Sequence, residues 1–250
     1  MRSLIFLIIF FYPSLLFALN VETVTFPSKD GLNITADIYL SHPKDAPFIV
    51  LFHQAGWSRG EYIEIAPKLN TIGFNCMAVD QRSGGEVNGV VNATFKEAEK
   101  TGKGTTYLDA MQDMEAAIEY ARAHYVKGKL LIWGSSYSAA LVLKFAGDNP
   151  KIADGVLAFS PGEYFEKFGK GKTFITQSAR NITSPVFITS ARSEKELWFS
   201  IYQAIQSKNK VYFIPKTEGE HGSRALWESK RAHKEYWDAI TSFLKEFTIK

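Results

Sequence analysis

The chain has 250 residues, of which 22% are charged and 46% are hydrophobic, and its formal net charge is +3. This length and balance suit one globular α/β domain that is large enough to bury a full core. The basic residues are scattered rather than gathered into a run, which excludes nucleic acid as an expected partner.

The first eighteen residues have the features of a secretion signal. Arg2 precedes an apolar run at residues 4–12, and a small residue, Ala18, stands where a signal peptidase would cut. The run is too short to span a bilayer comfortably. The sequence therefore predicts a signal peptide over residues 1–18, with an uncleaved membrane anchor as the alternative because Leu16 is large for its position.

The mature chain, residues 19–250, is predicted to be a single secreted or periplasmic domain with no stable membrane association after signal cleavage. Its only cysteine, Cys76, lies in the apolar run 74–79 and is expected to be a buried small hydrophobe. One cysteine cannot form an intrachain disulfide. Because cysteine is scarce and no His-rich tract occurs, we expect no metal site, and nothing in the sequence calls for a cofactor.

Strand patterns recur along the whole mature chain. Alternation at residues 21–26 and 34–39, around a turn at 28–31, predicts a β-hairpin. Later strands are short, continuous apolar runs, as expected for strands buried on both faces of a parallel sheet. These runs occupy residues 48–52, 76–79, 130–133, 156–159, 186–189 and 211–214. A mostly parallel sheet of about eight strands is predicted.

Helical periodicity fills the intervals between these strands and is clearest over residues 105–124. Further helices are expected at residues 139–146, 195–206 and 224–247. Two segments look irregular. Residues 83–104 resemble a long functional or mobile loop, and residues 160–184 are too short for a large lid domain.

A buried strand runs directly into a helix through Gly134-Ser-Ser-Tyr-Ser138. Here the chain resembles the α/β-hydrolases, whose nucleophile elbow G-x-S-x-G exposes a serine on a tight strand-to-helix turn. The resemblance implies that Ser136 is the nucleophile and that the fold is the α/β-hydrolase fold with a minimal lid. Ser138 departs from the usual Gly and is treated as a tolerated small residue. Ser135 and Ser138 are expected only to bond the backbone or cap the helix.

In that family the acid and the histidine follow later strands, in the order nucleophile, acid, histidine. The resemblance implies Glu194 as the acid, because it lies a few residues after the strand at 186–189. Two other carboxylates remain open, Glu163 after the preceding strand and Glu196 beside Glu194.

The general base is expected to be His221, which stands in a Gly-Glu-His-Gly loop after the last strand. An imidazole that titrates near neutral pH can take the serine proton, provided that a carboxylate fixes its tautomer.

The loop after the strand at 48–52 reads His53-Gln-Ala-Gly-Trp57. By resemblance, the backbone N–H of Ala55, or alternatively of Gln54, forms an oxyanion hole with that of Tyr137. His53 is expected to be structural. Gln54 and Trp57 are predicted to contact the substrate.

Within the superfamily the chain is most similar to small dienelactone-hydrolase-like esterases, although the dienelactone hydrolases proper use a cysteine nucleophile. The implied activity is hydrolysis of small carboxylic esters through an acyl-enzyme on Ser136. Two alternatives stand beside it: a non-catalytic binding protein on a hydrolase scaffold, and an amide or oligopeptide hydrolase. The expected partner is a small-molecule ester. The fold does not determine which ester this is.

Overall fold

The computed structural model describes residues 21–248. The expected signal peptide and its cleavage site lie outside the described residues. Within the described part of the chain, no helix is both long enough and apolar enough to cross a membrane.

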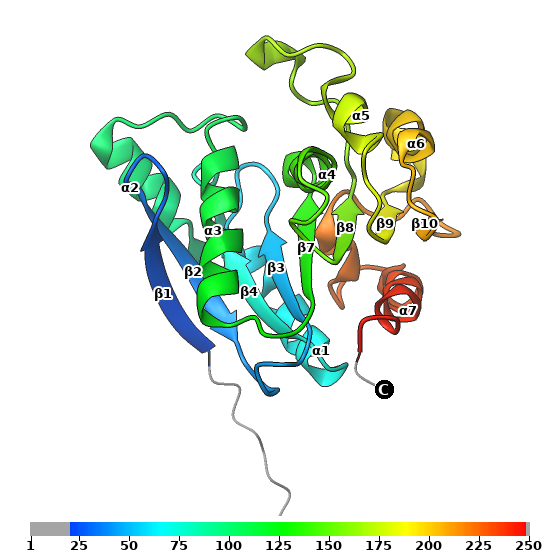
Figure 1. Cartoon of the computed structure of the whole chain (residues 1–250), viewed down its shortest axis with the longest axis horizontal. Coiled ribbons are helices and arrows are strands. Elements are labelled where there is room, and N and C mark those ends of the chain that lie inside the picture. The colour runs from blue at the N-terminus through cyan, green and yellow to red at the C-terminus, as the bar shows by residue number, and fades with distance from the viewer. Residues whose placement is uncertain (1–20, 249–250) are drawn as a thin grey trace, which may run out of the picture.

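The centre of the molecule is an eight-stranded sheet with the order β1-β2-β4-β3-β7-β8-β9-β10 (Figure 1). The pairs β1–β2 and β2–β4 are antiparallel and all other neighbouring pairs are parallel. This confirms the predicted mostly parallel sheet of eight strands. The strands are β1 Val21–Pro27, β2 Asn33–Tyr39, β3 Phe48–Phe52, β4 Asn75–Val79, β7 Leu130–Ser135, β8 Gly155–Phe159, β9 Val186–Thr189 and β10 Lys210–Phe213.

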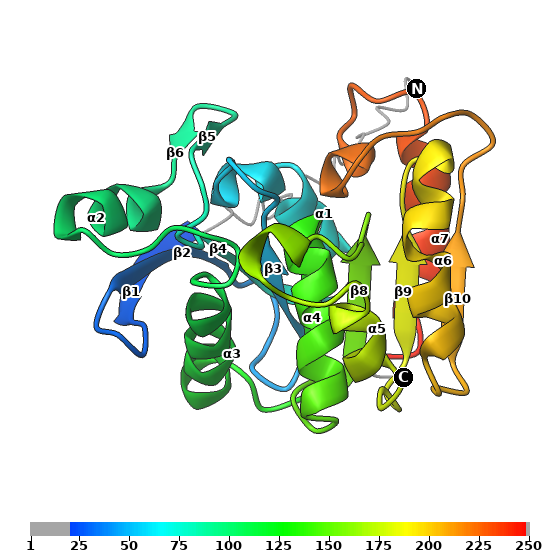
Figure 2. The same ribbon diagram turned by 90° about the horizontal axis from the view of Figure 1, so that it is seen from above.

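Helices cover both faces of this sheet (Figures 1 and 2). One hydrophobic core lies between the sheet and α3, α4, α5 and α6, and a second lies between the opposite face and α1 and α7. The helices are α1 Ile65–Thr71, α2 Ala93–Thr101, α3 Met111–His124, α4 Tyr137–Asp148, α5 Phe174–Ala179, α6 Lys195–Ala204 and α7 His233–Leu244.

Burial of the strands explains their continuous apolar sequences. Every residue of β3, β4, β7, β8 and β9 is buried, because helices lie on both sides of them. Cys76 on β4 is completely buried, as expected for a small hydrophobe, and burial raises the pKa of its thiol.

The segment 83–104 was expected to be an irregular loop, and this prediction is wrong. It contains a short hairpin, β5 Glu86–Val87 with β6 Val90–Val91, followed by α2. The Asn92 side chain caps α2 by accepting the N–H of Phe95 at 2.7 Å, and Gly102 ends it in a left-handed conformation with φ 68°. Residues that suggested a loop are therefore the two ends of a helix.

Three other boundaries differ from the prediction. The expected helix at 224–247 is divided into a 3₁₀ turn, η4 Ser223–Leu226, and α7, with Trp227 extended between them. α3 begins only at Met111, because the side chains of Thr106 and Asp109 bond each other and form a turn before it. The segment 160–184 includes η2 Glu166–Phe168 and α5.

The parallel strands direct their carboxyl ends to one edge of the sheet, where the arrowheads of β8, β9 and β10 meet (Figure 2). Loops after parallel strands are the usual position of binding sites in such sheets. The loops after β3, β7, β8, β9 and β10 carry the residues singled out from the sequence.

Candidate active site

The strand-to-helix turn at Ser136 has the backbone of a nucleophile elbow. Ser136 lies between β7 and α4 with φ 60° and ψ −121°, a conformation that L-residues rarely adopt. Its N–H donates to the carbonyl of Phe159 at 2.8 Å, which fixes the turn to β8. A Cβ at Gly134 would lie 2.3 Å from the carbonyl oxygen of Ser138, so the turn closes only with glycine there.

Accessibility distinguishes Ser136 from the two neighbouring serines. Ser135 and Ser138 are both completely buried, whereas Ser136 is half-buried. Ser138 Oγ accepts the N–H of Ser135 at 2.9 Å and lies 2.8 Å from the carbonyl oxygen of Phe52 on β3. Ser138 therefore bonds the backbone, as predicted, and its hydroxyl joins the elbow to β3.

Ser135 makes a contact that the sequence did not indicate. Its hydroxyl donates to Oε1 of Glu61 at 2.7 Å and accepts the N–H of Ser223 at 2.9 Å. A Cβ at Gly222 would come within 2.5 Å of this hydroxyl, so the glycine permits the histidine loop to approach the elbow. The expectation of a purely backbone-bonding Ser135 is incomplete, because a buried carboxylate is its acceptor.

His221 and Glu194 meet across two loops. Nδ1 of His221 lies 2.5 Å from Oε1 of Glu194, and Oε2 of Glu194 accepts the hydroxyl of Ser160 at 2.7 Å. Burial opposes ionisation of Glu194, but the hydrogen bonds from His221 and Ser160 outweigh it and hold its pKa below the ordinary glutamate value. An ionised carboxylate therefore faces the imidazole.

The alternative carboxylates are used elsewhere. Glu163 accepts the backbone N–H groups of Ile175 and Thr176 at 2.9 and 2.8 Å, at the start of α5. Glu196 is exposed on the first turn of α6. The structure thus brings Glu194, and neither alternative, to the imidazole of His221.

In the loop after β3, the backbone N–H groups of neighbouring residues differ in whether they donate to an acceptor in the protein. Gln54 N–H donates to Oε2 of Glu61 at 2.9 Å, and Gly56 N–H donates to the carbonyl of Ser83 at 3.0 Å. The N–H groups of Ala55 and Tyr137 have no hydrogen-bond acceptor within residues 21–248. Of the two expected donors on this loop, Ala55 is therefore the one that is not committed to a protein acceptor.

His53 has a structural environment, as predicted. It is completely buried, its Nδ1 lies 2.7 Å from the carbonyl oxygen of Gln54, and its Nε2 accepts the N–H of Gln81 at 3.0 Å. Burial lowers the pKa of His53 to about 4, so the ring is neutral. It links the loop after β3 to the turn after β4 through its bond with Gln81.

The two predicted substrate contacts differ in their surroundings. Gln54 is buried and its side-chain amide points to Glu61, with Nε2 3.4 Å from Oε1. Trp57 is half-buried and its ring stacks on Trp227, with centroids 5.4 Å apart. Trp227 in turn donates its indole N–H to the carbonyl of Glu61, which attaches this pair of rings to the loop after β3.

A second group of aromatic rings packs around Tyr137, the residue that follows Ser136. Tyr107 stacks on Tyr137 with centroids 4.5 Å apart and meets the edge of Phe168 at 5.2 Å. Lys167 lies over the Tyr107 ring at 4.6 Å. The sequence analysis did not single out Tyr107, Lys167 or Phe168, because Tyr107 lies in the predicted helix 105–124 and the other two lie in the irregular segment 160–184.

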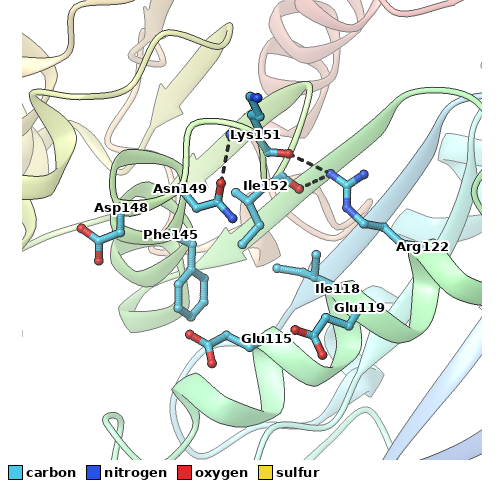
Figure 3. A pocket seen from close by; sticks show the side chains of 9 residues that line it. All are labelled: Glu115, Ile118, Glu119, Arg122, Phe145, Asp148, Asn149, Lys151 and Ile152. Carbon is cyan, nitrogen blue, oxygen red and sulfur yellow. Dashed lines mark hydrogen bonds between the residues drawn. The ribbon is translucent and has the colours of Figure 1, made fainter.

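A cavity of about 420 Å³ lies away from the elbow, between α3 and the carboxyl end of α4 (Figure 3). Its lining is mostly charged, and Arg122 there donates to the carbonyl oxygens of Lys151 and Ile152. Ser136 precedes the opposite end of α4, and a helix of twelve residues is about 18 Å long. Within residues 21–248 no cluster of three His, Cys, Asp or Glu side chains has the spacing of a metal site.

Comparison with known proteins identifies the family. The family model described as "Serine aminopeptidase, S33" matches residues 43–167, half of the 250-residue chain. This match includes the loop after β3 and the whole elbow. Among curated protein sequences, none matches the chain significantly.

Solved structures with low sequence identity share the fold. An esterase from Pyrococcus furiosus superimposes with a TM-score of 0.70 at 20% identity, over 92% of this chain and 93% of its own. A dienelactone hydrolase from Anabaena variabilis gives 0.68 at 11% identity, over 92% and 99%. A carboxyl esterase from Bacillus coagulans gives 0.67 at 13% identity, over 93% and 100%. The sheet order, the elbow and the family match agree, and the chain belongs to the serine aminopeptidase S33 family of α/β-hydrolases.

Proposed function

We propose that this protein is a serine hydrolase that cleaves small carboxylic esters through an acyl-enzyme on Ser136. The observation that carries the proposal is the 2.5 Å contact between His221 and Glu194, at the same sheet edge as the half-buried Ser136. A serine hydroxyl is a weak nucleophile until an oriented base removes its proton. The His221–Glu194 pair is such a base.

In the proposed reaction Ser136 Oγ attacks the ester carbonyl carbon while Nε2 of His221 takes the hydroxyl proton. The N–H groups of Ala55 and Tyr137 bind the oxyanion of the tetrahedral intermediate. Collapse of this intermediate expels the alcohol, which receives its proton from His221. Water then loses a proton to His221 and attacks the acyl group, which releases the carboxylic acid and restores the Ser136 hydroxyl. Glu194 stays ionised throughout, accepts the hydrogen bond of the Nδ1–H group and so fixes the tautomer of His221.

Two features support small esters as substrates. The segment between β8 and β9 holds only η2 and the short helix α5, which leaves little material for a long apolar tunnel. The esterase from Pyrococcus furiosus and the carboxyl esterase from Bacillus coagulans share the fold over nearly the whole chain. Trp57 is the proposed contact for the substrate, and the buried Gln54, whose side-chain amide points to Glu61, supports the loop after β3.

Active-site labelling tests this proposal. The purified protein and its Ser136→Ala variant are treated with a fluorophosphonate, and the modified residue is identified by mass spectrometry. We expect modification at Ser136 in the wild type and none in the variant. Hydrolysis of p-nitrophenyl acetate, butyrate and octanoate then ranks the acyl chain lengths, with the shortest cleaved best. Folded wild-type protein that is neither labelled nor active would establish the non-catalytic binding protein instead.

The family description favours one alternative activity, cleavage of a peptide bond next to a free amino group. An aminopeptidase needs an acceptor for the substrate's ammonium group, and the carboxylates beside His221 already have partners. Glu220 pairs with Arg224 at 3.2 Å, and Glu218 accepts the N–H of Ser193 at 3.1 Å. Comparison of alanine p-nitroanilide with p-nitrophenyl acetate separates the two activities. Faster turnover of the anilide would replace the ester proposal.

We further propose that the protein is exported and cleaved after Ala18, which leaves residues 19–250 as one secreted or periplasmic domain without stable membrane association. The support is the charged start, the apolar run and the small residue at the cut site. N-terminal sequencing of the protein from a fractionated bacterial host tests this. A mature chain in the extracellular or periplasmic fraction that begins at Leu19 is expected, and an intact N-terminus in the membrane fraction would indicate the uncleaved anchor.

A further inference from the structure

Glu61 is a buried carboxylate that the proposed reaction does not use. It belongs to η1 Arg59–Tyr62 in the loop after β3, and it is completely buried. Both carboxylate oxygens have partners. Oε2 accepts the N–H of Gln54 at 2.9 Å, and Oε1 accepts the hydroxyl of Ser135 at 2.7 Å.

These two partners come from the two halves of the oxyanion hole. Gln54 directly precedes Ala55, and Ser135 stands two residues before Tyr137. A bond to Gln54 N–H fixes the peptide that comes immediately before the Ala55 N–H. The bond from the Ser135 hydroxyl fixes the residue at which the elbow begins. One carboxylate thus bonds a residue next to Ala55 and a residue at the start of the elbow that carries Tyr137.

The histidine loop is attached to the same group. Ser135 Oγ accepts the N–H of Ser223, two residues after His221, and the indole of Trp227 donates to the Glu61 carbonyl at 2.9 Å. Three loops, which follow β3, β7 and β10, therefore converge on Glu61. An ionised Glu61 would also stabilise, by its negative charge, the positive charge that His221 acquires during the reaction.

We propose that Glu61 is a positioning residue that joins the oxyanion loop, the nucleophile elbow and the histidine loop, and sets the distance between the two oxyanion donors. This inference rests on the proposed ester hydrolysis. Removing the carboxylate leaves the Gln54 N–H and the Ser135 hydroxyl without acceptors and lets the two donors move apart. Because an oxyanion forms only after the serine attacks, the consequence falls on the transition state rather than on substrate binding.

Three variants test this role. Glu61→Ala removes both acceptor oxygens. Glu61→Gln keeps the shape and one acceptor, but its amide nitrogen cannot accept the Ser135 hydroxyl. Glu64→Gln is the matched control, because Glu64 lies on the same segment and is exposed. The kcat and KM of each variant are measured with p-nitrophenyl acetate, and hydrogen exchange is followed in peptides that cover residues 53–57 and 134–138.

For Glu61→Ala we expect kcat to fall about 100-fold while KM changes less than about threefold. Glu61→Gln is expected to have a kcat about tenfold higher than that of Glu61→Ala, because its carbonyl oxygen still accepts the Gln54 N–H. Glu64→Gln should match the wild type. Exchange should become faster in both peptides of Glu61→Ala and stay unchanged elsewhere in the chain. If Glu61→Ala does not fold, Glu61→Gln carries the test through its loss of kcat at constant KM.

A kcat within threefold of the wild type in both Glu61 variants would overturn the inference. So would unchanged exchange in the two peptides. A wild-type protein that neither reacts with a fluorophosphonate nor cleaves esters would refute the proposed hydrolysis instead. In that case hydrogen exchange alone decides whether Glu61 joins the loops, with faster exchange at both peptides supporting the connection and unchanged exchange excluding it.

Discussion

The hydroxyl of Ser160 donates a 2.7 Å hydrogen bond to Oε2 of Glu194, although the two residues follow different strands of the sheet. The same oxygen of Ser160 accepts the N–H of Gly222 at 2.9 Å. Ser160 has a left-handed backbone with φ 55°, held by its own N–H bond of 2.6 Å to the carbonyl of Thr189. It therefore links the acid to the loop that carries the histidine.

Ser160→Ala should lower kcat/KM for p-nitrophenyl acetate by roughly tenfold, because a hydrogen bond to a charged group contributes about 1.5–3 kcal/mol. The pKa of Glu194 should rise toward its ordinary value when this bond is lost, since the bond favours the ionised form. Steady-state kinetics across pH measure both effects. Ser193→Ala, an exposed position directly before Glu194 in the loop after β9, serves as the control, and equal activity of the two variants would refute a positioning role for Ser160.

Glu194→Gln and Glu163→Gln should affect different properties. A glutamine at 194 removes the charge that fixes the His221 tautomer, and we expect kcat to fall roughly 10³–10⁴-fold. A glutamine at 163 weakens the bonds at the start of α5, so it should cost about 1 kcal/mol of stability with activity unchanged. Kinetics and urea denaturation of both variants provide the comparison. Loss of activity in Glu163→Gln alone would assign the acid to Glu163.

The buried carboxyl of Glu61 should make stability depend on pH. Burial raises its pKa from 4.5 to about 7, so between these values the folded protein binds a proton that the unfolded chain has released. The contribution of Glu61 to the free energy of unfolding is therefore present below pH 4.5 and is lost as the pH rises through about 7. The difference corresponds to roughly 3 kcal/mol.

Urea denaturation of the wild type and Glu61→Gln between pH 4.5 and 8 measures this effect. Because glutamine does not titrate, the stability of the variant relative to the wild type should increase across this range. Subtracting the two curves cancels the groups that both proteins share. A difference that stays constant with pH would contradict the raised pKa.

Ser138→Ala should destabilise the protein by about 1–3 kcal/mol, because the N–H of Ser135 would lose its acceptor inside the buried elbow. Ser138→Gly, which restores the usual residue of the motif, removes the same hydroxyl and should be destabilised similarly. Thermal unfolding of the two variants measures the change. Stability equal to the wild type in both would show that the Ser138 hydroxyl does not contribute to holding the elbow on β3.

Local signals in the sequence were enough to predict most strands of the sheet. Runs such as 48–52 and 130–133 are apolar at every position because helices cover both faces, and this burial is visible in one short segment at a time. The elbow was equally local, since Gly134 is required by a contact with Ser138 only four residues away. The missed helix α2 shows the limit, because Asn92 and Gly102 mark either a loop or the two ends of a helix.

The sequence by itself determined the strands of the main sheet and the helices between most of them, the elbow at Ser136 and the loop of His221. Only the tertiary structure decided which carboxylate meets the imidazole and that Glu61 lies beneath the elbow. Glu61 and Ser135 are 74 residues apart, and Ser160 and Glu194 are 34 apart. Backbone dihedrals and apolar periodicity depend on neighbours along the chain, whereas such contacts depend on which strands are adjacent and in what register.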